Sequence, residues 1–211
     1  MIYLSKPWLM IILILLLLNS VSLKFNQSNR FMLLALIFSF FGDVLLMINP
    51  TTDELFISGL LSFMIGHLMY TYAFYLDTET PLNRRWEGAH LLIPFLFIAH
   101  AILIASQMIV NLEGVMMIAV LTYVVVITIM GATAASRIRD GFTLDRIILL
   151  VGILFFVISD TLIGVTKFID PDLPFARPVI MIQYLLAQIL IILGWISKPS
   201  ATKEQHILSR A

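Results

Sequence analysis

Seven stretches of the chain are apolar over about the length that a helix needs to cross a membrane. A membrane-spanning helix requires about 20 mostly apolar residues. The stretches that meet this requirement are residues 7–23, 31–49, 55–76, 89–109, 112–135, 144–168 and 178–197. They predict an all-α protein, a polytopic bundle of seven transmembrane helices that forms a single domain over residues 1–197.

Polar and turn-forming segments separate these stretches. Asn49-Pro50-Thr51-Thr52-Asp53 has the composition of a turn, and Asp170-Pro171-Asp172 interrupts a helix. Residues 198–211 are expected to form a short, solvated cytoplasmic tail. A secretory signal is the alternative for the first stretch, because Ser20-Val21-Ser22 resembles a cleavage site. The Ile/Leu run over residues 10–18 favours a membrane anchor instead.

The composition supports a membrane protein and excludes several kinds of chemistry. Hydrophobic residues make up 60% of the chain and charged residues 12%, against roughly 25% charged in a soluble domain. The chain has no cysteine, which excludes disulfides, thiolate nucleophiles and iron–sulfur clusters. Its formal net charge is zero, so no charged tail points to nucleic acid. The four histidines are scattered, and we expect no metal and no other cofactor.

Basic residues divide unequally between the two sides of the predicted bundle. Ten of the 13 lie on one side, namely Lys24, Arg30, Arg84, Arg85, Arg137, Arg139, Arg146, Lys198, Lys203 and Arg210. The other side carries Lys6, Lys167 and Arg177. Because the basic side of a membrane protein faces the cytoplasm, we expect the N-terminus outside and the C-terminus inside. We expect an integral multi-pass protein of the bacterial inner membrane.

Two aspartates lie within the apolar stretches. An aspartate at a helix centre costs about 2.5–3.5 kcal/mol on insertion scales, so Asp43 and Asp160 are the strongest functional candidates. Both helices run outward from the basic side, and both carboxylates are expected roughly 9–10 Å below the outer boundary. Gly42 and Ser159 precede them and permit close helix approach. The two aspartates are predicted to face each other across a cleft between the second and sixth helices.

The alternative is that each aspartate separately bonds a neighbouring Ser, Thr or Tyr and only fixes helix packing. Gln183 and Tyr184 share the depth of the aspartates, and Gln188 lies one turn deeper. His67 lies nearer the midplane, with Tyr70 one turn further on. A catalytic and a packing role are both open for His67.

Other polar residues within the helices are interpreted as packing residues. A single membrane histidine such as His100 is more often a neutral, hydrogen-bonded side chain than a catalyst. Thr122, Tyr123 and Thr128 on the fifth stretch are interpreted as packing residues with satisfied hydroxyl groups.

Four short motifs follow one another along the chain. They are Gly42-Asp43-x-x-Leu46-Met47, then Gly59-Leu60-x-Ser62-Phe63-x-x-Gly66-His67-x-x-Tyr70, then Leu154-Phe155 followed by Ser159-Asp160-x-x-Ile163, and finally Tyr184-x-x-Ala187-Gln188-x-Leu190-Ile191. Together with Lys6-Pro7, their order and spacing resemble the YhhN-like lysoplasmalogenase family over roughly residues 6 to 195. That family usually has eight spans, and the helix expected before Lys6-Pro7 has no counterpart here.

The resemblance implies hydrolysis of the vinyl-ether bond of a lysoplasmalogen. The products would be a fatty aldehyde and glycerophospho-ethanolamine or -choline. The residues that match the motifs, and are thereby implied as catalytic, are Asp43, Asp160 and His67. A vinyl ether is cleaved after protonation of its outer alkene carbon, which leaves an oxocarbenium ion that water captures. Two nearby carboxylates in a low dielectric share a proton, so one can deliver it while the other stabilises the cation.

The substrate would be a lysophospholipid that enters from the bilayer. Lys167 and Arg177 lie near the outer ends of their helices and are predicted to bind its phosphodiester. The alternative is that both residues only mark helix ends at the interface. The other predicted substrate-binding residues are Tyr70, Gln183, Tyr184 and Gln188.

Other classes of membrane protein fit less well. A proton-coupled transporter or channel would use the same aspartates, but the helices lack the paired Gly/Pro breaks of discontinuous transporter helices. An intramembrane aspartyl protease would need Tyr-Asp and Pro-Ala-Leu motifs, which the chain does not contain. A retinal photoreceptor would need a lysine in the last stretch, and residues 178–197 contain none.

Overall fold

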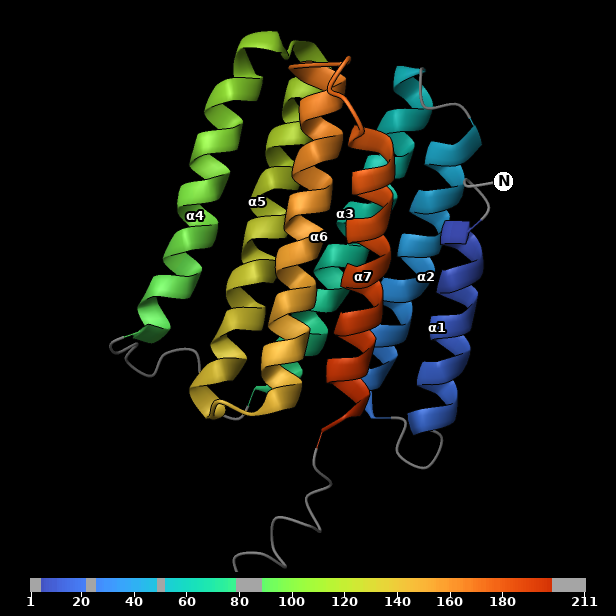
Figure 1. The fold of residues 1–211 in the computed structure, drawn as a ribbon, viewed down its shortest axis with the longest axis vertical. Coiled ribbons are helices and arrows are strands. Elements are labelled where there is room, and N and C mark those ends of the chain that lie inside the picture. The colour runs from blue at the N-terminus through green and yellow to red at the C-terminus, as the bar shows by residue number, and fades with distance from the viewer. Residues whose placement is uncertain (1–4, 22–25, 49–51, 79–88, 199–211) are drawn as a thin grey trace, which may run out of the picture.

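Seven α-helices form the bundle in the computed structural model of the protein, which describes residues 5–21, 26–48, 52–78 and 89–198 (Figure 1). The helices are α1 (Ser5–Val21), α2 (Gln27–Ile48), α3 (Asp53–Asp77), α4 (Ala89–Met108), α5 (Gly114–Ser136), α6 (Leu144–Phe168) and α7 (Ala176–Ile196). Short 3-10 turns, η2 (Ile109–Asn111) and η3 (Arg137–Asp140), follow α4 and α5. The described residues contain no strand. The predicted all-α architecture is confirmed.

The helices have the length and composition of membrane spans. Six of them, α2 to α7, are long and apolar enough to cross a bilayer among the residues described. The first helix, α1, is apolar but has only 17 residues, which at 1.5 Å per residue is about 25 Å. The protein is therefore a multi-pass helical bundle. The helix bounds differ from the predicted spans by up to four residues, and those of α6 agree at both ends.

Successive helices run in opposite directions, so α2, α4 and α6 are parallel to one another (Figure 1). Lys6, Lys167 and Arg177 lie at one end of the bundle, and Arg137 and Arg146 lie at the other. We call the end with Lys6 the outer end, after the predicted orientation. Which end faces the cytoplasm stays a prediction. Lys24, Arg84, Arg85, Lys203 and Arg210 lie outside the described residues.

Packing within the bundle is built on two close helix pairs, α2 with α3 and α6 with α7. Helix α1 covers α2 and α7, α5 packs against α3 and α6, and α4 lies at the edge of the bundle against α5 (Figure 1). Small residues permit these approaches. A Cβ atom on Gly194 would lie 2.6 Å from the Asp145 carbonyl oxygen, so α7 and α6 touch through their backbones.

The small residues before the two aspartates face different helices. A Cβ on Gly42 would lie 2.6 Å from the Phe63 ring of α3. The Ser159 hydroxyl donates to the carbonyl of Ile180 on α7, at 3.1 Å. Gly42 and Ser159 therefore admit α3 and α7, whereas the sequence pattern suggested that they bring α2 and α6 together.

The inner end of the bundle is tied by charged residues. Asp77 at the end of α3 accepts a hydrogen bond from Arg137 at 2.7 Å and pairs with Lys198 at 2.5 Å. The Lys198 ammonium lies 3.2 Å from the centre of the Trp195 ring. Burial lowers the pKa of Lys198 to about 8, although the Asp77 carboxylate opposes this shift. Asp77 and Trp195 thus bind the side chain of Lys198, the first residue of the predicted solvated tail. Residues 199–211 lie outside the described residues.

Candidate functional site

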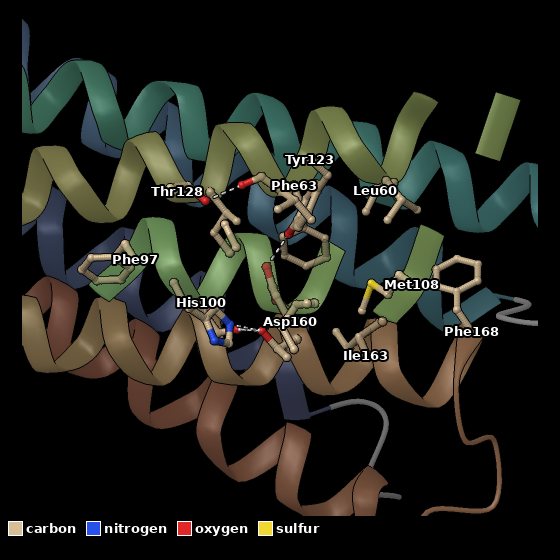
Figure 2. A pocket seen from close by; sticks show the side chains of 18 of the residues that line it. Leu60, Phe63, Phe97, His100, Met108, Tyr123, Thr128, Asp160, Ile163 and Phe168 are labelled. Carbon is tan, nitrogen blue, oxygen red and sulfur yellow. Dashed lines mark hydrogen bonds between the residues drawn. The ribbon is translucent and has the colours of Figure 1, made fainter. Parts of the chain in front are cut away.

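Asp160 on α6 is bound by side chains from two other helices. The Tyr123 hydroxyl of α5 donates a hydrogen bond to Asp160 Oδ2, and Figure 2 shows this hydroxyl pointing toward the carboxylate. His67 Nε2 of α3 lies 3.2 Å from the same Oδ2 and 2.8 Å from the Tyr123 oxygen. The Asp160 side chain is 8% exposed. Among the described residues, none forms a hydrogen bond with Oδ1, which leaves that oxygen available to a ligand.

Asp43 on α2 has a separate set of partners. The Tyr184 hydroxyl of α7 donates to Asp43 Oδ2 at 2.7 Å. The Lys6 ammonium lies 4.0 Å from Oδ1 and 4.6 Å from the centre of the Tyr184 ring. Tyr70 donates to Gln188 Oε1 at 2.7 Å, and Gln188 Nε2 lies 3.5 Å from the Tyr184 hydroxyl. Asp43 is 1% exposed, so it is a buried carboxylate at the end of a hydrogen-bonded chain that spans α3 and α7.

Aromatic rings of α3, α6 and α7 connect the two aspartate clusters. The Tyr184 ring contacts Phe63 and Phe156 at centroid distances of 6.0 and 5.6 Å. The Phe156 ring lies 4.9 Å from that of His67. In the part of the chain that is described, no hydrogen bond joins the two carboxylates. Each aspartate bonds a tyrosine, as in the packing alternative, and their joint role in catalysis stays a prediction.

A mostly apolar cavity of about 70 Å³ lies beside Asp160. Its lining comes from α3, α4, α5 and α6, with Leu46 of α2 (Figure 2). The polar side chains in the lining are His100, Tyr123, Thr128, Asp160 and Thr161. Asp43 is not part of the lining. This cavity therefore differs from the predicted cleft between α2 and α6. Side chains of α3 and α5 contact Asp160, and side chains of α1 and α7 contact Asp43.

His100 on α4 reaches the cavity beside Asp160 (Figure 2). Its Nε2 lies 2.8 Å from the hydroxyl oxygen of Thr161, the residue that follows Asp160. The sequence interpretation of a hydrogen-bonded histidine agrees with this contact. The position of His100 in the cavity lining could not be read from the sequence.

Lys167 lies at the outer end of the same cavity. Its ammonium forms an ion pair with Asp53 at 3.1 Å and lies 5.1 Å from the centre of the Phe56 ring. The Phe56 and Phe168 rings meet edge to face at 5.8 Å, and both line the cavity. Lys167 is therefore next to the cavity, as a residue that binds a headgroup would be.

The other predicted substrate-binding residues have different surroundings. Arg177 is exposed in the first turn of α7, and within the described ranges it has no ion pair. Gln183 is half-buried, and its Oε1 is enclosed without a hydrogen-bond partner. Tyr70, Tyr184 and Gln188 belong to the Asp43 cluster described above.

Two residues of these clusters were missed by sequence reasoning. Lys6 faces Asp43 at 4.0 Å, and the signal was a basic residue next to an apolar stretch, at the outer end toward which Asp43 lies. Tyr123 was interpreted as a packing residue, but its hydroxyl binds Asp160. The signal was a phenol within an apolar helix, since a buried hydroxyl requires a partner. Among the residues described, no group of three or more His, Asp or Glu side chains could hold a metal ion.

Comparison with known proteins assigns the chain to a family. The model of the YhhN family matches residues 1–195. The chain belongs to the YhhN family. It is 29% identical over 189 residues to the bovine (Bos taurus) lysoplasmalogenase TMEM86A, a match that covers 88% of this chain and 73% of the relative. It is 30% identical over 172 residues to human (Homo sapiens) lysoplasmalogenase TMEM86A, covering 80% of this chain and 66% of the relative. No solved structure matches the chain.

Proposed function

We propose that this YhhN-family protein is a lysoplasmalogenase. It hydrolyses the vinyl-ether bond of a lysoplasmalogen to a fatty aldehyde and glycerophospho-ethanolamine or -choline. The observation that carries the proposal is Asp160, an intramembrane carboxylate with an unbonded oxygen in the lining of an apolar cavity. The similarity to proteins named lysoplasmalogenase supports it. That the protein resides in a bacterial inner membrane stays a prediction.

The apolar lining suits the chain of a lipid with its headgroup at the outer end, and the free volume of about 70 Å³ has to widen for such a chain to enter. Lys167 attracts the phosphodiester at the mouth, beside Phe56 and Phe168. The seven residues from Asp160 to Lys167 correspond to about 10 Å along α6. This distance, with the reach of the lysine side chain, matches the separation between a phosphate and a vinyl ether at the first glycerol carbon. The alkenyl chain then extends inward past Phe97 and Ile127.

Asp160 delivers the proton that begins the reaction. Its Oδ2 accepts the Tyr123 hydrogen bond, and its Oδ1 carries the proton toward the outer alkene carbon. When the proton leaves, the hydrogen bonds from Tyr123 and His67 stabilise the carboxylate that forms. The carboxylate in turn stabilises the neighbouring oxocarbenium ion. Water adds to this ion, and the hemiacetal collapses to the aldehyde and the glycerol hydroxyl.

The charge of Asp43 influences the protonation state of Asp160. Two like charges in a low dielectric disfavour simultaneous ionisation, so the two carboxylates together retain a proton. The Tyr184 hydrogen bond and the nearby Lys6 ammonium oppose the cost of burying an ionised Asp43. We assign the shared proton to Asp160 because Asp160 is the carboxylate that lines the cavity. Asp43 is therefore a positioning residue, and Asp160 is the acid that touches the substrate.

The experiment is to incubate purified protein with a lysoplasmalogen and to measure release of fatty aldehyde by mass spectrometry. Asp160→Asn should lower kcat by about 10²–10⁴-fold, as expected for loss of a general acid. Asp43→Asn should also lower kcat while the protein inserts and purifies normally. The matched control is Asp172→Asn, at an exposed aspartate outside the helices, which should keep full activity. An active Asp160→Asn variant, or proton transport without aldehyde release, would overturn the proposal.

A further inference from the structure

His100 has a defined tautomer because of its contact with Thr161. A threonine hydroxyl carries one proton, and Thr161 donates that proton to the Val157 carbonyl at 2.8 Å. With that proton engaged, we assign the Thr161 oxygen as the acceptor of the hydrogen bond from His100 Nε2, at 2.8 Å. It follows that Nε2 carries the proton of the neutral ring and that Nδ1 is an unprotonated acceptor.

The acceptor nitrogen of His100 is not engaged by another described side chain or backbone group. His100 lines the cavity together with Asp160, and no described residue forms a hydrogen bond with its Nδ1. Met108 ends α4 eight residues after His100, and Phe168 ends α6 eight residues after Asp160. Because α4 and α6 are parallel (Figure 1), the imidazole and the carboxylate lie at the same level of the cavity (Figure 2).

Other candidate bases are less suited to this place. His67 does not line the cavity, its Nε2 is bonded to Tyr123 and Asp160, and its Nδ1 is enclosed without a partner. Asp43 also lies outside the lining. Of the described side chains that line the cavity, His100 is the one with an unprotonated nitrogen available to water.

We propose that His100 is the general base that activates the water in this reaction, a role that rests on the proposed lysoplasmalogenase function. The carbon that receives the proton and the carbon that water attacks are neighbours in a vinyl ether. The acid that protonates one carbon and the base that activates water for the other must therefore lie at the same level of the cavity. Asp160 on α6 and His100 on α4 meet this requirement from two different helices. A neutral imidazole is well suited to accept a proton near neutral pH.

The steps balance in protons and bonds. Asp160 transfers its proton to the outer alkene carbon, and the double-bond electrons form the new C–H bond. Water then bonds to the oxocarbenium carbon as His100 Nδ1 takes a proton from it, which gives a hemiacetal and an imidazolium ion. In the collapse, the imidazolium protonates the departing glycerol oxygen while the Asp160 carboxylate takes the hydroxyl proton. Both residues return to their starting states, and no other reactant than water is consumed.

The first test compares His100→Ala with His100→Gln. A glutamine amide can still donate to Thr161, so it preserves a packing role, but it cannot take a proton from water. Both variants should lower kcat for aldehyde release by about 10²-fold or more. Added imidazole should partly restore the Ala variant. Normal turnover in either variant would overturn the role of His100 as the base.

Deuterium exchange separates loss of water activation from loss of the whole site. In D2O, Asp160 transfers a deuteron to the alkene carbon. Without His100 the cation persists long enough for its C–C bond to rotate, and it then returns to substrate by losing protium to the same carboxylate, which leaves deuterium on an alkene of inverted geometry. Substrate recovered from His100→Ala should gain deuterium at its outer vinyl carbon, whereas substrate recovered from Asp160→Asn should not. Loss of both turnover and exchange in His100→Ala would assign His100 to packing and overturn the inference.

Thr161→Val tests the assigned tautomer, and Thr166→Val is its matched control. Both threonines lie on α6 and donate to the carbonyl four residues earlier, at 2.8 and 2.9 Å. Only Thr161 contacts His100, and Thr166 is outside the cavity lining. Thr161→Val should lower kcat with little change in KM, and Thr166→Val should match the wild type. Equal rates in the two variants would contradict the inference. Absence of aldehyde from the wild-type protein would instead refute the proposed function itself.

Discussion

At the scale of single residues, the hydroxyl of Tyr123 decides how Asp160 is used. It donates to Oδ2 and so leaves Oδ1 as the oxygen that faces a ligand. A hydrogen bond to an ionised group contributes about 1.5–3 kcal/mol. The hydrogen bond is therefore strongest after Asp160 has given up its proton. An interaction that strengthens as the reaction proceeds raises the rate, whereas one of constant strength only improves substrate binding.

Tyr123→Phe should consequently lower kcat by roughly 10- to 100-fold and change KM little, since about 1.4 kcal/mol corresponds to a tenfold change in rate. The measurement is the steady-state rate of aldehyde release over a range of substrate concentrations. Tyr72→Phe is the control, because Tyr72 is an exposed residue of α3 away from the cavity. A Tyr123→Phe variant with the kcat of the wild type would show that the hydroxyl only fixes packing.

At the scale of helices, the site depends on the close pairing of α6 with α7. Helix α6 carries Asp160, and α7 carries Tyr184 of the Asp43 cluster. The backbones of the two helices approach each other at Gly194. A Cβ on Gly194 would lie 2.6 Å from the Asp145 carbonyl oxygen and 2.7 Å from the Leu149 nitrogen. Backbone atoms of a packed helix cannot move away as a flexible side chain can, so an added methyl group forces the helices apart.

Gly194→Ala should therefore destabilise the protein by about 1–3 kcal/mol, seen as a lower thermal midpoint of the purified protein in detergent. Gly66→Ala is the comparison, because a Cβ there would lie 3.3 Å from the nearest backbone oxygen, that of Ala35. That variant should lose less stability. Equal midpoints for the two variants would mean that α7 tolerates displacement from α6.

At the scale of the whole molecule, the sequence predicted where the helices lie along the chain better than which helices contact one another. Helix length and direction follow from the spacing of apolar stretches and turns, and α6 was predicted at both ends. Which helices touch depends on the shapes of side chains far apart in the chain. Gly42 receives Phe63 of α3, and no local pattern distinguishes this from an approach by α6. The cavity was missed for the same reason, because it is defined by side chains from five helices.

The orientation of the whole bundle in the membrane gives the last prediction. Arg137 and Lys198 lie at the end opposite Lys6, together with Arg139 and Arg146, and an excess of Lys and Arg marks the cytoplasmic side. A phosphatase reporter that is active only outside the cytoplasm should therefore be inactive when fused after the C-terminus or inserted at Gly141. The same reporter inserted at Glu113, in the turn between α4 and α5 at the outer end, should be active. The reverse pattern would place the mouth of the cavity beside Lys167 in the cytoplasm, and a lysoplasmalogen would then have to enter from the inner leaflet.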